Sequence, residues 1–183
     1  DEVEELVERL RRSLEKIRDR VRRLLERIKR LAEKIKRDIE RLHKKNEDLA
    51  REMRKSERKS DKDRKEVLDR LRRRVEEVKK ENKEVLEKAE RDVKRIADEI
   101  KKVLDDLRKH SRDLEEEVRR LDGKEELRKK LRKVVEDHKR VLEEVKDRLT
   151  KVLRELEEVL EKVKRDIKKS LEDLEKVLRE LEK

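Results

Sequence analysis

Apolar residues recur at steps of three and four along nearly the whole chain, and this spacing constrains the possible folds more than any other feature. It is the spacing of one stripe on an amphipathic α-helix, because about 3.6 residues complete a turn. The pattern maps onto itself after eighteen residues, as in Ile17, Ile35 and Met53. Since eighteen residues make about five turns at the natural pitch, we expect nearly straight helices that need little supercoil.

Two interruptions of this stripe divide the 183 residues into thirds. Residues 54–63 form a polar run, and residues 121–124 hold the only glycine, Gly123, in a chain without proline. Glycine reaches positive φ without a Cβ penalty, so Gly123 predicts a left-handed helix stop and a hairpin. Polar caps, each followed three residues later by an acid, mark the expected helix starts: Asp1, Ser60 and Asp122.

The expected fold class is all-α: a single-chain, antiparallel, up-down-up three-helix bundle with very long, nearly straight helices. We expect one helical-bundle domain over residues 1–183, with helices at about 2–58, 61–121 and 124–182. The alternative is a four-helix bundle. It would need breaks near residues 90 and 137, where the apolar stripe continues.

Composition narrows the classes of function. The chain is 63% charged with a net charge of +11, and it contains no Phe, Trp, Tyr or Cys. Absence of cysteine excludes disulfides and thiolate chemistry. No apolar run is long enough to span a bilayer and no signal-peptide pattern opens the chain, so we expect a soluble protein without a membrane partner.

Seven polar residues occupy phases of the repeat that are otherwise apolar, and they are the candidate site residues. They are Ser13, His43, Asn46, Asn82, Ser111, His138 and Ser170. Buried polar groups need partners, so we expect hydrogen bonds between helices, such as His to Ser. Such bonds fix the register of the helices, which a uniform aliphatic core leaves degenerate.

Folding the chain at its two turns groups some of these residues. Ser13, Ser111 and His138 fall at one level near the Gly123 end, with His110 one residue off the core phase. Near the opposite end, His43 and Ser170 come to similar heights, and Asn46 lies one turn away.

A metal or catalytic centre is the other interpretation of these residues. Zinc needs about four converging ligands, and only one core-phase histidine is available at each end. His110 could approach His138, but no core-phase carboxylate or thiolate joins them. A Ser-His pair also lacks an orienting acid and a glycine-rich turn for an oxyanion hole. We therefore expect no enzyme activity, no metal and no cofactor.

Arginine clusters at 18–23 and 70–74 are the features that favour nucleic acid or another polyanion. Acidic and basic residues alternate along the outward faces, which is typical of a solvated surface. Without aromatic platforms or a recognition helix, we expect only weak, non-specific, salt-sensitive contact with polyanions.

The aliphatic core, the Lys/Arg/Glu/Asp surface, the eighteen-residue phase, the caps and the Asp-Gly turn together resemble a computationally designed, parametrically generated long helical bundle. Lys79 and Glu115 depart from the pattern, because they share a phase with Ala97 at the core margin. Natural spectrin-like repeats are the nearest alternative, but they usually contain aromatics. Burial of the three stripes predicts a hyperstable monomer. The resemblance implies a scaffold with no substrate, cofactor or partner and with no natural location, which would be cytoplasmic in an expression host. The alternatives are a helix-mediated interaction module or a non-specific polyanion binder.

Overall fold

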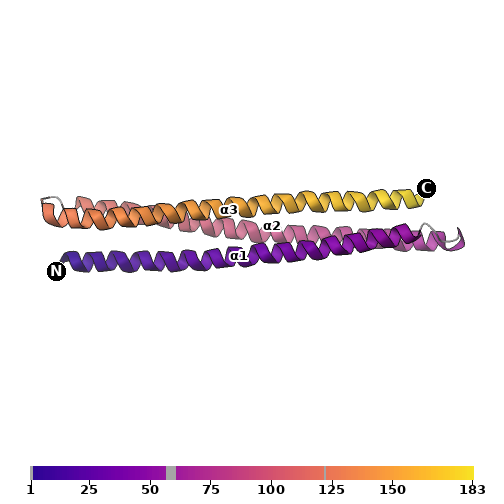
Figure 1. The fold of residues 1–183 in the computed structure, drawn as a ribbon, viewed down its shortest axis with the longest axis horizontal. Helices are drawn as coiled ribbons and strands as arrows, with labels where there is room; N and C mark the ends of the chain where they lie inside the picture. Colours follow the sequence, from indigo (N-terminus) through magenta and orange to yellow (C-terminus); the bar gives the residue numbers. More distant parts are fainter. Residues whose placement is uncertain (1, 57–60, 122) are drawn as a thin grey trace. The chain divides into compact units, whose positions relative to one another are not determined.

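The computed structural model describes residues 2–56, 61–121 and 123–183, and it consists of three α-helices. They are α1 (Glu2–Ser56), α2 (Asp61–Arg119) and α3 (Glu125–Glu182), and no strand occurs in the described residues (Figure 1). The three-helix bundle is therefore confirmed over the four-helix alternative. The caps expected at Asp1, Ser60 and Asp122 lie outside the described residues.

Contacts between Cα atoms divide the chain into two compact units, and every helix contributes to both. Unit 1 comprises Asp1–Arg30 and Lys94–Glu155, and unit 2 comprises Leu31–Val93 and Leu156–Lys183. Within each unit, one segment of α1, one of α2 and one of α3 pack together. Of the helices that the structure describes, none combines the length and hydropathy needed to cross a bilayer.

In unit 1, ion pairs show that α1 and α2 run antiparallel with a constant register. Arg9 pairs with Glu117 and Arg20 with Asp106, so eleven residues forward along α1 match eleven back along α2. The core between the helices is aliphatic, with Leu114, Leu131 and Leu149 fully buried. Each such burial contributes roughly 1.5–3 kcal/mol, so the stripes provide most of the stabilisation.

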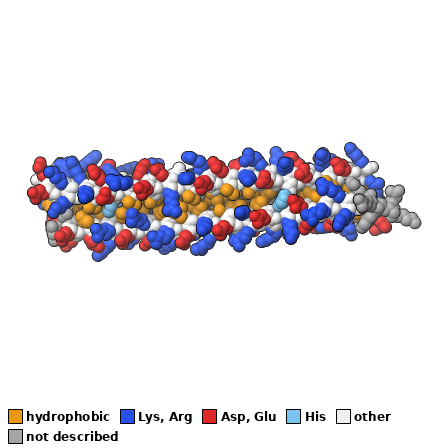
Figure 2. Space-filling view, in the orientation of Figure 1, with side chains coloured by type: hydrophobic (Ala, Val, Ile, Leu, Met, Phe, Trp, Pro, Cys, Tyr) orange, Lys and Arg blue, Asp and Glu red, His pale blue; other side chains and the backbone are white. Residues whose placement is uncertain are grey.

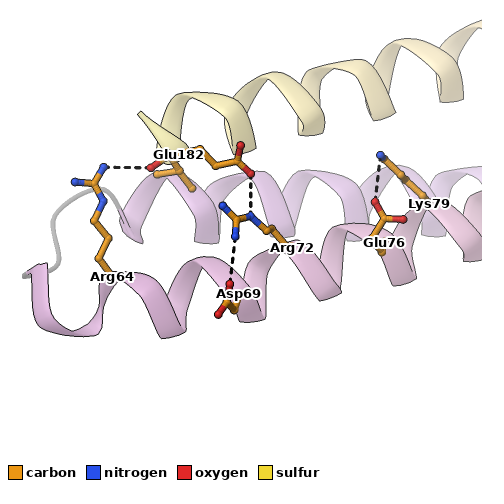
Figure 3. Close-up of polar contacts among 7 residues, drawn as sticks. Arg64, Asp69, Arg72, Glu76, Lys79 and Glu182 are labelled. Atoms are coloured by element: carbon orange, nitrogen blue, oxygen red, sulfur yellow. Dashed lines mark hydrogen bonds and ion pairs between the residues drawn. The ribbon is translucent and has the colours of Figure 1, made fainter.

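In unit 2, buried apolar side chains of all three helices form a core cluster. It contains Leu49, Met53, Leu71, Val75, Leu174, Val177 and Leu181. Polar side chains of α2 contact the C-terminal end of α3 (Figure 3). Arg64 donates to the Leu181 carbonyl at 3.1 Å, and Arg72 bonds Glu182 at 2.9 Å. The carbonyls in the last turn of a helix have no partner within that helix, and Arg64 of α2 provides a partner for one such carbonyl of α3.

The turn between α2 and α3 depends on Gly123, whose φ is +95°. Backbone hydrogen bonds from Leu121 N to the Val118 carbonyl and from Lys124 N to the Leu121 carbonyl tighten the chain on either side. These bonds belong to turns, and α2 accordingly ends at Arg119. No heavy atom would lie within 4 Å of a Cβ built on Gly123, so backbone conformation rather than space requires the glycine.

Replacing Gly123 with Ala should lower the free energy of unfolding by about 1–2 kcal/mol, because an L-residue pays that much for the left-handed conformation. Urea unfolding followed by circular dichroism measures the loss. Lys124→Ala is the matched control, because no residue other than Gly123 has positive φ in the described chain. Equal stability of the Gly123→Ala variant and the parent would contradict the conformational requirement.

Candidate functional site

The most completely bonded polar group in the core is a cluster in unit 2 formed by Asn46 of α1, Asn82 of α2 and Ser170 of α3. Asn46 is 2% exposed and Asn82 is 0% exposed. The two amides bond each other reciprocally, with Nδ2 to Oδ1 distances of 3.1 and 3.2 Å. Asn46 Nδ2 also donates to Ser170 Oγ at 3.0 Å, and Asn82 Nδ2 donates to the Val78 carbonyl at 2.7 Å.

This arrangement uses both N–H donors and the oxygen of each buried amide. Moving one helix by a turn, about 5.4 Å, would separate the partners and leave buried polar groups unpaired. The cluster therefore favours one register among α1, α2 and α3 in unit 2. The sequence singled out all three residues but gave no reason to pair Asn46 with Asn82, because levels counted from the first turn place them far apart.

His43 is a correction to the expected buried set. Its side chain is 61% exposed, and its Nε2 lies 2.8 Å from Glu47 Oε1 one turn along α1. The eighteen-residue phase that His43 shares with Val7 and Leu25 lies at the margin of the stripe, and both of those residues are only half-buried. The imidazole consequently reaches solvent and does not bond Ser170, whose partner is Asn46.

The second polar group lies in unit 1, where Ser13 Oγ and His110 Nδ1 are 3.4 Å apart. His138 on α3 is 7% exposed, and Ser111 is half-buried with no hydrogen bond to another described side chain. His110 Nε2 and His138 Nδ1 are buried and have no hydrogen-bond partner among the described residues. Burial lowers the pKa of both rings.

Charged neighbours modify these two pKa values unequally. Asp113 partly offsets the burial of His110. Burial is the largest cause of the lowered pKa of His138, followed by the positive charge that His110 would carry. Asp137 raises this pKa, and Arg18 and Arg11 lower it by smaller amounts. The two imidazoles thus disfavour each other's protonation, as like charges in a low-dielectric core must.

The geometry of this histidine pair does not match a catalytic or metal centre. Within the described residues, no group of three or more His, Cys, Asp or Glu side chains is placed to hold a metal ion. The 3.4 Å Ser13–His110 contact is long for an activated nucleophile. Helical N–H groups in the middle of α1 and α2 are used by the i→i−4 ladder, so they cannot form an oxyanion hole.

The arginine clusters that favoured polyanions are partly neutralised by ion pairs between helices. Arg20 pairs with Asp106 at 2.5 Å, Arg72 with Glu182 at 2.9 Å, and Arg74 with Glu52. The two departures from the apolar phase have the same explanation. Lys79 pairs with Glu175, and Glu115 pairs with Lys139 at 2.6 Å, so both residues connect α2 to α3.

Ion pairs between helices all involve α2 in the part of the chain that the structure describes. They join α1 to α2 and α2 to α3 in both units, and none joins α1 to α3. Two grooves of about 400 and 420 Å³ lie on the α1–α2 side of unit 1, and two larger grooves lie on the α1–α3 side. One in unit 1 has a volume of about 650 Å³, and one in unit 2 has about 800 Å³. Figure 2 shows hydrophobic side chains exposed between flanking charged ones.

Comparisons with known proteins identify a fold. No protein-family model matches the chain, and no curated protein sequence does. A solved structure described as a "Computationally designed three helix bundle" is similar over 98% of this chain and 87% of that chain. The TM-score is 0.54 and the sequence identity is 19%. The shared feature is the three-helix fold.

The amide cluster predicts different outcomes for single and paired substitutions. Asn82→Leu alone should lower the free energy of unfolding by about 1–3 kcal/mol, because it leaves Asn46 buried without its main partner. Asn46→Leu combined with Asn82→Leu should recover most of that loss, since two apolar side chains need no partner. Urea unfolding of both variants measures this, and a double variant less stable than either single one would contradict the pairing.

Stability should fall with acidification through the histidine range. Because burial holds the folded-state pKa of His110 and His138 below the unfolded value of 6.5, unfolding takes up protons. Their contribution to stability is complete above pH 6.5 and is lost as pH falls from there toward the lower folded-state values. Urea unfolding at several pH values between about 7 and 5 should show this slope, well above the carboxylate range.

Variants separate this effect from other groups. Replacing both His110 and His138 with Gln should flatten the slope, because the two buried imidazoles are then absent. An unchanged slope in the His110→Gln/His138→Gln variant would assign the pH dependence to groups outside the core.

Proposed function

We propose that this chain is a designed structural scaffold without a natural biochemical function. The observation that carries the proposal is an aliphatic core that contains a buried amide cluster. In this cluster every side-chain N–H of Asn46 and Asn82 donates a hydrogen bond. Such a combination specifies a shape. Its likeness in fold to a computationally designed three-helix bundle supports the same conclusion.

The scaffold is a hyperstable monomer that needs neither cofactor nor metal, and its net charge of +11 keeps it soluble. That charge also allows weak adsorption to polyanions that salt abolishes. The proposed scaffold is one cooperative domain over residues 1–183, and the continuity of α1, α2 and α3 from one unit into the other supports it. Loss of packing in one unit therefore frays helices that the other unit needs.

Thermal unfolding tests the stability of the scaffold. The circular dichroism signal at 222 nm should remain helical beyond about 90 °C, the range that defines hyperstable domains. Light scattering after size exclusion should give the mass of one 22.6 kDa chain. A midpoint at about 45–65 °C, as in ordinary mesophilic domains, would contradict hyperstability.

Matched cavity variants test the single cooperative domain. Leu114→Ala in unit 1 and Leu174→Ala in unit 2 each truncate a buried leucine and should cost about 2–5 kcal/mol. If the units unfold together, hydrogen exchange read by mass spectrometry will show protection falling in both units with either variant. Loss confined to the substituted unit would show that the two units unfold independently.

A further inference from the structure

The α1–α3 side of unit 1 contains a groove with an aliphatic floor. The groove has a volume of about 650 Å³, and Val21, Leu25, Val141 and Val145 are its apolar lining residues. Val21 is buried, but the other three are only half-buried although they belong to the apolar stripes of α1 and α3. Apolar surface that is incompletely covered between two packed helices gains free energy if a third surface covers it.

The charged side chains around this floor are mostly basic, and in the described part of the chain no ion pair matches these cations. Arg18, Arg22 and Lys29 of α1 and Arg148 of α3 line the groove. None of these four has a carboxylate within ion-pair distance among the residues that the structure describes. The two acids of the lining are Glu26 and Glu144, and Glu26 is 3.8 Å from Arg30 on its own helix.

Cations on the other side of α1 provide the comparison. Arg20 and Arg27 face α2, which supplies Asp106 at 2.5 Å and Glu99 at 2.6 Å. Thus α1 presents arginines along both margins of its apolar stripe. On the α2 side, carboxylates of α2 match Arg20 and Arg27 but, within the described helices, not Arg23. On the α3 side, no ion pair with α3 occurs among the described residues. An acidic helix lying in the groove would supply carboxylates to the cations of α1 on this side.

We propose that this groove binds one amphipathic α-helix whose aliphatic stripe is bordered by glutamate or aspartate. A helix satisfies its own backbone hydrogen bonds, so it can cover the apolar floor without leaving peptide groups unpaired. Its stripe packs on Leu25, Val141 and Val145, and its carboxylates pair with the four cations. The lining from Arg18 to Lys29 corresponds to about three turns, so a partner of about 20 residues suffices.

A second copy of the chain is a poorer occupant than an acidic helix. In a two-fold symmetric dimer the same patch contacts itself, so the two sets of unmatched cations would be brought together. Each copy also carries a net charge of +11. The scaffold function does not depend on this groove, and its tests by unfolding are independent of binding.

Tryptophan fluorescence measures the binding directly, because the chain itself contains no Trp or Tyr. The probe is a synthetic peptide of about 20 residues with Leu and Ile at helical spacing, Glu on both flanks and one Trp within the stripe. Titration with the full chain should give a saturable blue shift at one peptide per chain, with gain of helicity. Affinity should fall as salt rises.

Three peptides and two variants locate the site. A peptide with Lys in place of Glu and a scrambled Glu peptide should each bind at least about tenfold more weakly. Arg18→Glu, Arg22→Glu and Arg148→Glu together should weaken binding of the Glu peptide by at least about tenfold. The control variant combines Arg95→Glu, Lys101→Glu and Arg112→Glu, which change exposed residues of α2 in the same unit by the same net charge and should retain binding.

Several results would overturn the proposal. No saturable binding, or equal loss of affinity in both charge variants, would show that the groove is not the site. Equal binding of the scrambled Glu peptide would indicate polyanion adsorption by net charge alone. A doubled mass of the chain without peptide, reversed by the groove variant, would identify a second copy as the occupant. Circular dichroism of each variant confirms that the comparison is made between folded proteins.

Discussion

Burial of aliphatic stripes is the constraint on which the rest of the structure depends. The chain has no aromatic side chain and no cysteine, and 63% of its residues are charged. Only the leucines, valines and isoleucines can therefore offset the entropy lost on ordering so polar a chain. The spacing of those residues is that of a helix and of no other element, so the same positions specify both the helices and the core.

The ion pairs are distributed unequally among the three helix pairs. Carboxylates and cations across the α1–α2 and α2–α3 margins make ion pairs such as Lys45–Glu81 at 2.7 Å and Glu90–Lys164 at 3.0 Å. Each exposed pair contributes little to stability, about 0–1 kcal/mol. Within the described residues, every ion pair between helices involves α2, so α2 is the helix that forms ion pairs with both of the others. Among the residues that the structure describes, no such pair joins α1 to α3, and the larger grooves lie on that side.

The sequence predicted helices, breaks and the class of bundle because these follow from local periodicity. The sequence could not predict which positions of an apolar stripe face each of the two neighbouring helices and which lie exposed at its margin. His43 shares its phase with Leu25, yet it is exposed because that phase lies on the open α1–α3 side. Asn46 and Asn82 were both recognised as polar core positions, but their pairing depends on the register of α1 against α2. Register is set by packing along whole helices, and no single turn reveals it.

The two polar groups of the core differ in how completely their hydrogen bonds are made, and this difference separates specificity from stability. Both amides of the Asn46–Asn82 pair use all their donors, so the pair penalises other registers at little cost to the native one. His110 and His138 each retain a buried nitrogen without a partner among the described residues. That arrangement costs free energy even when both rings are neutral, and more when either is protonated. Unit 2 thus contains the polar group whose hydrogen bonds favour one register, whereas unit 1 contains two imidazoles whose pKa values are lowered by burial.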